Sequence, residues 1–201
     1  MSKIGQAKIL GGVGALLSLL IIVPTVGFLL GLVGLILIFI AVKYIADETK
    51  NHSIFQNYLL NFILSVVALG AVIGIMIMSF GLAGGVSWAT GLQEQNITDF
   101  NTFWSSFSTF IGGCLVALLV AWVLLILSSL YLKKSYDKIA EHTKVDLFKT
   151  TGLVYFIGAA TLIIIIGLFI IIVAKILEIV SYFSLPENLP QSTEVPKTDT
   201  V

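Results

Sequence analysis

The stretch Ile9–Val42, ILGGVGALLSLLIIVPTVGFLLGLVGLILIFIAV, decides the fold class, because it contains no charged residue. As one straight helix it would be about 51 Å long, at ~1.5 Å per residue, whereas the hydrocarbon core of a bilayer is about 30 Å thick. Pro24 stands near its middle, and proline interrupts a helix but begins one well. The stretch therefore predicts a helical hairpin with arms at 9–23 and 26–42 and a tight turn at Pro24–Gly27. Because both arms are short, full crossing and re-entrant insertion both stay open.

Three further apolar runs, each long enough for a spanning helix, follow at 58–80, 107–132 and 152–174. The apolar pattern of the last run continues past Lys175 and Glu178 to residue 183, so these two residues are expected near the membrane interface. The predicted fold is all-α, a polytopic transmembrane helical bundle with five hydrophobic segments. It forms one domain, 1–183, followed by a polar tail at 184–201 that is expected to be extended or disordered.

The composition of the whole chain agrees with a membrane protein. Of the 201 residues, 58% are hydrophobic and 11% are charged, against about 25% charged in soluble domains. Basic and acidic residues balance at 11 each, which excludes the basic excess of a nucleic-acid binder. Cys114 is the single cysteine, so an intrachain disulfide framework and a cysteine-rich metal site are excluded. The lipid bilayer is the first partner that the chain predicts.

The positions of the lysines, which are the only basic side chains apart from histidine, predict an orientation. With five segments, nine lysines fall on one side of the membrane and two, Lys175 and Lys197, on the other. Lysine-rich loops favour the cytoplasm. The N-terminus is therefore expected inside the cell, the C-terminal tail outside it, and the protein in the plasma membrane.

One loop on the predicted outer side carries a candidate modification site. The sequence Asn96-Ile97-Thr98 is an N-glycosylation sequon. Its position between the third and fourth segments agrees with an extracytoplasmic loop, so Asn96 is a candidate glycosylation residue.

Small residues recur at helical spacing and are candidate helix-packing positions. In lipid such residues let helix backbones approach closely. They can pack within one bundle, or against a second copy or another membrane protein, and both alternatives stay open. The candidates are Gly27 and Gly31, Gly70 and Gly74, and Gly113, Ala117 and Ala121.

Groups that could carry chemistry are scarce within the predicted segments. Ion and proton pathways generally need ionisable groups inside the bilayer, and the segment centres contain none. Asn61 is the one amide in a span and is a candidate for an intramembrane polar contact. A proton-coupled carrier is therefore not expected, whereas a passive pathway for a neutral solute stays open.

The predicted inner face holds the remaining polar candidates. Its two loops contain carboxylates and the two histidines, which are groups that can bind metals or perform acid–base chemistry. Their spacing matches no metal or catalytic motif, so we expect no catalytic residue, no metal and no cofactor. These residues are Asp47, Glu48, His52, Asp137, Glu141, His142 and Asp146.

Several stretches of the first 80 residues resemble an archaeal family of small multi-pass membrane proteins that is known only as a domain of unknown function. The resemblance is carried by Gly11–Leu17, by the Pro24–Gly27 turn with Gly31 and Gly34 after it, by Ala41–Asp47, and by Ser53–Asn57. It implies an archaeal plasma membrane and brings no activity, cofactor or catalytic residue with it.

Three functions follow as hypotheses. The first is a non-catalytic structural or accessory subunit that associates with other membrane proteins or with a second copy of itself. The alternative is a passive channel or carrier for a small neutral solute, which requires a polar path near Asn61. The third is a membrane enzyme that uses the carboxylates and histidines of the inner face.

Overall fold

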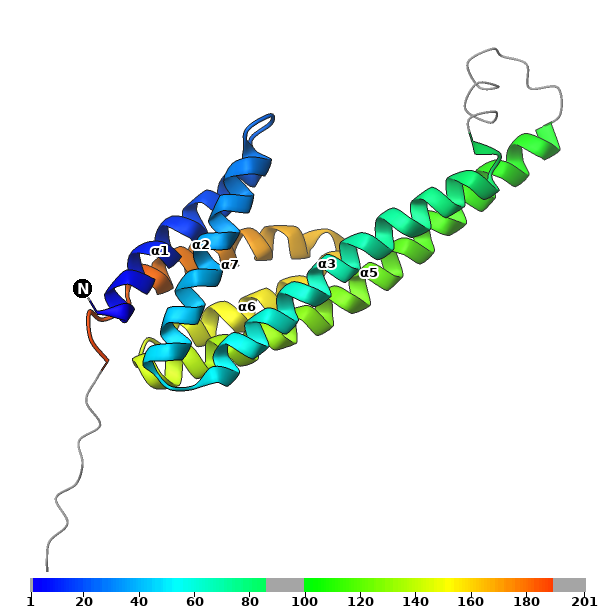
Figure 1. Cartoon of the computed structure of the whole chain (residues 1–201). Helices are drawn as coiled ribbons and strands as arrows, with labels where there is room; N and C mark the ends of the chain where they lie inside the picture. The colour runs from blue at the N-terminus through cyan, green and yellow to red at the C-terminus, as the bar shows by residue number, and fades with distance from the viewer. Residues whose placement is uncertain (1, 86–99, 190–201) are drawn as a thin grey trace, which may run out of the picture.

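The computed structural model describes residues 2–85 and 100–189, and every regular element in these two ranges is a helix (Figure 1). Helix α1 (Lys3–Leu19) leads through the short 3-10 helix η1 (Leu20–Ile22) into α2 (Gly27–Glu48). Helix α3 (His52–Leu82) and helix α5 (Phe100–Thr143) are the longest elements. The chain ends with α6 (Leu147–Ala160), the 3-10 helix η2 (Leu162–Ile164) and α7 (Ile166–Phe183).

The six α-helices form three antiparallel pairs that close into a ring. Each helix contacts the one before it, and α7 returns to contact α1. Gly14 and Gly34 bring the backbones of α1 and α2 together, since a Cβ atom on Gly34 would lie 2.5 Å from the Gly14 carbonyl oxygen. In the second pair the Ser135 hydroxyl of α5 donates to the Ile54 carbonyl of α3 at 2.8 Å.

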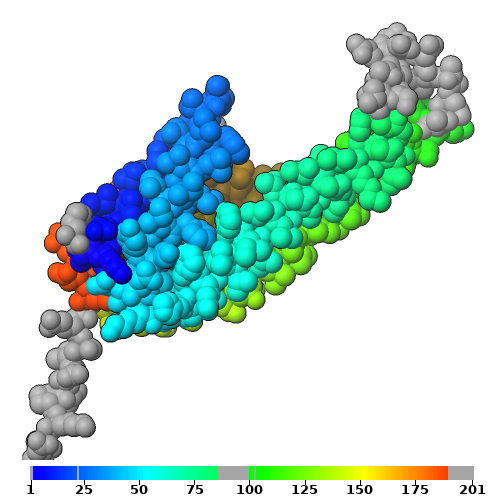
Figure 2. Space-filling model, in the orientation of Figure 1, coloured from blue at the N-terminus to red at the C-terminus, as the bar shows by residue number. Residues whose placement is uncertain are grey.

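The buried core lies at the end of the ring where the chain begins. It is built from side chains of all six helices, including Ile4, Ile45, Ile54, Tyr136 and Phe148, and all five are completely buried. Away from this end the helices expose large apolar side chains along their length. Figure 2 shows the arm formed by α3 and α5 standing away from the α1–α2 pair. Exposed apolar surface of this extent is what a bilayer covers.

Four helices are long and apolar enough to cross a membrane, compared with the five segments expected from the sequence. They are α2, α3, residues 103–143 of α5, and α7. Pro24 lies in the connection between α1 and α2, and α1 itself, with 17 residues, is not among the four. The apolar helices support a membrane-embedded protein.

The prediction that 152–174 forms one continuous helix is wrong. Helix α6 ends at Ala160, and α7 turns back along it, so that Thr151 faces Ser181 with 3.0 Å between their hydroxyl oxygens. Ile165, at the reversal, has a φ of 65°, in the left-handed region. The reversal is possible because Gly158 and Gly167 meet there without side chains. A Cβ atom on Gly167 would lie 2.2 Å from the Gly158 carbonyl oxygen, and one on Gly158 would lie 2.8 Å from the Ile171 side chain. Hydropathy is uniform across the turn and therefore does not reveal it.

Because α7 folds back along α6, the helical region ends beside its own beginning. The Ser2 hydroxyl donates to the Glu187 carbonyl oxygen, so residues 184–189 lie beside the start of α1 (Figure 1). The expectation that the two ends of the helical region emerge on opposite sides does not fit this contact. The rest of the predicted polar tail, 190–201, lies outside the described residues.

Candidate functional site: a polar cavity inside the helix ring

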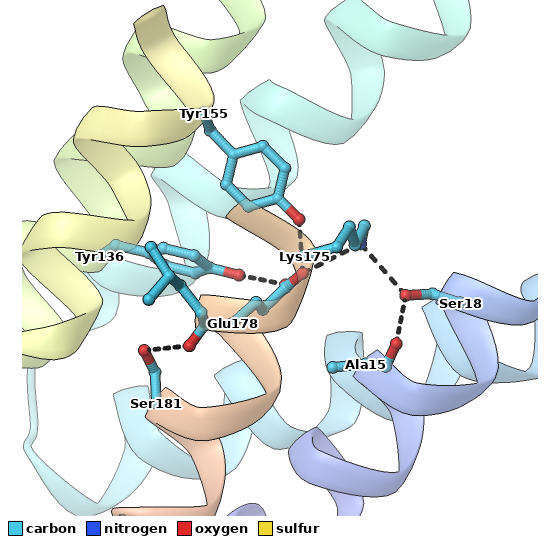
Figure 3. Close-up of polar contacts among 8 residues, drawn as sticks. Ala15, Ser18, Tyr136, Tyr155, Lys175, Glu178 and Ser181 are labelled. Atoms are coloured by element: carbon cyan, nitrogen blue, oxygen red, sulfur yellow. Dashed lines mark hydrogen bonds and ion pairs between the residues drawn. The ribbon is translucent and has the colours of Figure 1, made fainter. Parts of the chain in front are cut away.

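Glu178 is the buried charge of the helix ring. It is 2% exposed, although it lies on the apolar helix α7. Its Oε1 accepts a hydrogen bond from the Tyr136 hydroxyl of α5 at 2.5 Å, and its Oε2 accepts one from the Tyr155 hydroxyl of α6 at 2.6 Å (Figure 3). Removing a carboxylate from water is costly unless its oxygens are bonded in this way. The interaction therefore ties three helices together at one carboxylate.

Lys175, one turn before Glu178 on α7, supplies the opposite charge. Its Nζ lies 2.9 Å from Glu178 Oε2 and 3.1 Å from the Ser18 hydroxyl oxygen of α1 (Figure 3). The ammonium group also lies 5.7 Å from the centre of the Tyr155 ring. The lysine side chain is 28% exposed and that of Glu178 is 3% exposed. The pair is electrically neutral, and its basic member is the one that solvent or a ligand can reach.

A second polar cluster joins α3 to α5. The Ser128 hydroxyl lies 2.7 Å from Asn61 Oδ1 and 2.9 Å from the Asn61 carbonyl oxygen, and both atoms can accept its proton. The Ser65 hydroxyl oxygen lies 2.8 Å from that of Ser128. Among the described residues, the amide nitrogen of Asn61 has no hydrogen-bond partner, so its two N–H groups remain available.

Both clusters line one cavity of about 240 Å³. Asn61, Ser65, Ser128 and Ser129 lie on the α3–α5 pair, and Tyr155, Lys175 and Glu178 lie on α6 and α7, while Leu35 of α2 and other apolar side chains complete the lining. The cavity therefore combines amide, hydroxyl and ammonium donors with apolar walls, which is the composition of small-molecule sites. We call it the Asn61 cavity.

The sequence located only part of this site. It singled out Asn61 and placed Lys175 and Glu178 near the membrane interface, but it did not predict that Glu178 is buried among side chains of other helices. The signal was present as spacing, because Lys175, Glu178 and Ser181 recur at three residues and so share one face of a helix. What hid the site is that Tyr136 and Tyr155 come from other helices.

The predicted packing residues have different surroundings. A Cβ atom on Gly27 would lie 2.5 Å from the Leu20 carbonyl oxygen, and Gly31 faces the Ile21 side chain. Gly113 faces the Ser79 side chain, and Ala117 and Ala121 on the same helix are buried. A Cβ atom added to Gly70 or Gly74 would have no atom of another helix within 4 Å. The sequon residue Asn96 lies outside the described residues.

The polar groups of the expected inner face are spread around the end of the bundle where the chain begins. His142 Nε2 lies 2.9 Å from the amide nitrogen of Asn51, so the two polar turns meet there. Lys133 and Asp137 pair within α5 at 2.6 Å. Within 2–85 and 100–189, no three histidine, cysteine or acidic side chains gather closely enough to hold a metal ion.

Comparison with known proteins agrees with the resemblance predicted from the sequence and extends it into the second half of the chain. The family described as "Protein of unknown function (DUF996)" matches residues 30–176. An uncharacterized protein of Methanocaldococcus jannaschii is 37% identical over 187 residues, which cover 93% of this chain and 96% of the relative. No solved structure matches the chain. The chain therefore belongs to the family of proteins of unknown function DUF996.

Proposed function

We propose that this protein is a non-enzymatic, multi-pass protein of the plasma membrane whose Asn61 cavity binds a small neutral polar solute and gives it a passive route through the helix ring. The observation that supports the proposal is the lining of that cavity. Polar and ionisable groups inside apolar helices are costly, and where they face a cavity they generally mark a solute or ion site. This favours the solute pathway over the purely structural role among the functions expected from the sequence.

The charge of the cavity determines which solutes it suits. Lys175 and Glu178 neutralise each other, so an added ion would have no opposite charge left to pair with in a medium of low dielectric constant. An uncharged solute with hydrogen-bond acceptors can instead use the free N–H groups of Asn61 and the partly exposed side chain of Lys175. Pockets for drug-sized ligands measure about 300–1,000 Å³, so a volume of about 240 Å³ favours a smaller molecule.

The arrangement of the acidic group supports binding without bond chemistry. The two oxygens of Glu178 already accept bonds from two tyrosines and from Lys175. A general base has to come within hydrogen-bond reach of the proton that it removes, and Glu178 is 2% exposed behind these three donors. We therefore assign Glu178 the role of holding Lys175 and the tyrosines in place.

Flux through reconstituted vesicles tests this function. Vesicles containing the protein are placed in glycerol or urea, and their swelling is followed by light scattering, with sodium chloride as the ionic comparison. We expect faster entry of a neutral solute than in protein-free vesicles, and no faster entry of salt. Asn61→Leu should reduce the neutral flux several-fold, because it removes the free donors and adds apolar volume. Ser108→Ala, on the exposed surface of α5, is the matched control and should leave the flux unchanged.

Two results would contradict the proposal. One is neutral-solute entry no faster than in protein-free vesicles, with protein that is shown to be folded. The other is an equal flux in Asn61→Leu and in the unaltered protein, because the solute would then pass elsewhere.

A second candidate function is an accessory subunit, and one observation favours it. Gly70 and Gly74 share a face of α3 that no other helix covers in the described part of the chain. In membranes such a face allows another helix to approach closely. Cross-linking from Gly70→Cys in native membranes, with Cys114 replaced by alanine, would identify a second copy or another subunit. If the residue cross-links only to lipid, this candidate fails.

The orientation that we propose follows from the lysines. The turns 49–51 and 144–146, Ser2 and Glu187 all lie at the end of the ring that holds the buried core. Lysines are concentrated in and beside these turns, and lysine-rich segments favour the cytoplasm. We therefore place this end, with both Ser2 and Glu187, on the cytoplasmic side, and we call it the cytoplasmic end.

A further inference from the structure

Two of the connections between helices are unlike the others in their chemistry. The turns at the cytoplasmic end, 49–51 and 144–146, contain lysine, asparagine and aspartate. The connections at 20–26 and 161–165, at the opposite ends of their helices, contain no charged residue. They nevertheless expose large apolar side chains, with Ile21 at 56%, Val26 at 51%, Ile164 at 59% and Ile165 at 71%. A connection of this composition is unsuited to water.

Several backbone amides of both apolar connections donate to carbonyl oxygens of the same connection. In the first, Val23 donates to Leu20, Val26 to Pro24 and Gly27 to Val23, and Pro24 has no N–H group to satisfy. In the second, the amides of Ile164 and Gly167 both donate to the Thr161 carbonyl, and Ile165 donates to Leu162. A turn within hydrocarbon must satisfy its polar groups internally, because lipid offers no partner. Both turns meet part of this condition.

The lengths of the helices show how far each pair reaches. Helices α1 and α6 have 17 and 14 residues, or about 26 and 21 Å at ~1.5 Å per residue. The bilayer core is about 30 Å thick, and both helices begin in the lysine-bearing end of the bundle. Helices α3 and α5, with 31 and 44 residues, are about 46 and 66 Å long. The partners of α1 and α6, which are α2 and α7, have 22 and 18 residues, are about 33 and 27 Å long and are among the four helices that could cross, so it is the shorter helix of each of these pairs that limits its crossing. Only the α3–α5 pair is long enough to cross with both of its helices.

The two short pairs also enter from the same side. Helix α7 runs antiparallel to α1, with Tyr182 against Gly11 and Lys175 bonded to Ser18. This register continues to the contact between Ser2 and Glu187. The free ends of both pairs therefore lie together, and their apolar turns both point away from the cytoplasmic end.

From these observations we infer that α1–α2 and α6–α7 are two re-entrant hairpins, inserted from the cytoplasmic end, whose apolar turns end among the acyl chains of the lipids. Helices α3 and α5 are then the two complete crossings. The occupant around the turns is lipid, since no charged group exists between residues 9 and 42 or between 150 and 174 to hold either turn at the opposite headgroups. This arrangement does not depend on whether a solute enters the Asn61 cavity.

Cysteine labelling tests the inference directly, because Cys114 is the single native cysteine and can be replaced by alanine. Single cysteines are placed in the two turns as Val26→Cys and Ile164→Cys, at the cytoplasmic end as Glu48→Cys, and at the start of α5 as Phe100→Cys. A membrane-impermeant maleimide is applied to sealed vesicles of each orientation, and the full-length protein is then analysed by mass spectrometry. In parallel, a bimane label attached in detergent is exposed, after reconstitution, to lipids with a nitroxide on the acyl chain.

The expected pattern distinguishes insertion from crossing. Glu48→Cys should react from one side only and Phe100→Cys from the other only. Val26→Cys and Ile164→Cys should react from neither side until detergent is added, and bimane at both turns should be strongly quenched by the acyl-chain nitroxide. If Val26→Cys does not accumulate, Phe28→Cys, which is 66% exposed beside the same turn, replaces it.

Two outcomes would overturn the inference. Reaction of either turn from the Phe100 side would mean that the hairpin crosses the bilayer. Turns that neither react nor are quenched would be covered by protein, either a second copy or another subunit, and lipid would not be their surroundings.

Discussion

At the scale of single residues, Glu178 has the most demanding environment in the described chain. A carboxylate that is 2% exposed depends on its three hydrogen-bond donors, and these come from α5, α6 and its own helix. Removing one partner of a buried ion pair leaves the other charge without compensation, which is the costly case. Glu178 is therefore expected to influence stability as well as the shape of the cavity.

Glu178→Gln should lower the free energy of unfolding by about 1–3 kcal/mol. The amide replaces one acceptor oxygen with an N–H donor, which then faces the tyrosine hydroxyl and the ammonium group that previously donated. Thermal unfolding of the purified protein in mild detergent measures the loss. Glu141→Gln, the same change at an exposed position, is the matched control and should leave the melting temperature nearly unchanged.

A double variant separates the charge from the packing. Lys175→Met combined with Glu178→Gln should recover part of the lost stability, because it removes the unpaired ammonium group and keeps an apolar stem of similar length. A double variant that is less stable than Glu178→Gln alone would contradict the assignment of Lys175 as the charge partner.

At the scale of elements, the hairpins depend on places where two backbones touch. In α1–α2 the contact is between Gly14 and Gly34, and in α6–α7 it is between Gly158 and Gly167. Close approach lets helices pack by van der Waals contact, which is the main attraction available in lipid. A side chain at such a point has to push the two helices apart.

Gly34→Ala should destabilise the protein by about 1–3 kcal/mol, the usual cost of adding a methyl group to a filled site. The physical reason is that the new Cβ atom would lie 2.5 Å from the Gly14 carbonyl oxygen. Gly70→Ala adds the same methyl group to α3, where nothing lies within 4 Å, and serves as the control. Comparing the melting temperatures of the two variants in detergent checks the prediction, and equal values would contradict the packing described for α1 and α2.

At the scale of the whole molecule, the six helices close a ring by bringing its two ends together. The contact between Ser2 and Glu187 joins these two ends. The Asn61 cavity is lined by α2, α3, α5, α6 and α7, helices that follow one another in the sequence. The arm of α3 and α5 extends beyond the ring (Figure 1).

Cross-linking tests this closure. In the Cys114→Ala background, Ser2→Cys with Glu187→Cys should be joined efficiently by a short bifunctional maleimide, because the two positions are in contact in the folded chain. Ser2→Cys with Phe100→Cys is the control and should give no intramolecular product, since Phe100 begins the far end of the arm (Figure 1). Cross-linking is read from the mobility of the monomer in denaturing gels. If the first pair stays unlinked while both cysteines react singly with maleimide, the ring is not closed in this way.

The sequence by itself determined the all-helical, membrane-embedded character of the protein and its family. Apolar run length, charge placement and the glycine patterns of the first 80 residues are local properties, so they can be read without knowledge of contacts. Asn61 was found for the same reason, because a single amide within an apolar run can be recognised in the sequence.

Only the tertiary structure decided the reversal at 161–165, the joining of the two ends and the burial of Glu178. The reversal depends on Gly158 meeting Gly167 across two helices, and a hydropathy profile treats both as parts of one apolar rod. Glu178 is surrounded because Tyr136 and Tyr155 arrive from α5 and α6, residues that are 42 and 23 positions away in the chain. Whether a charge near the end of an apolar run is solvated or buried depends on such distant partners. Which partners contact it is determined by the packing of the helices, and the order of residues alone does not reveal that packing.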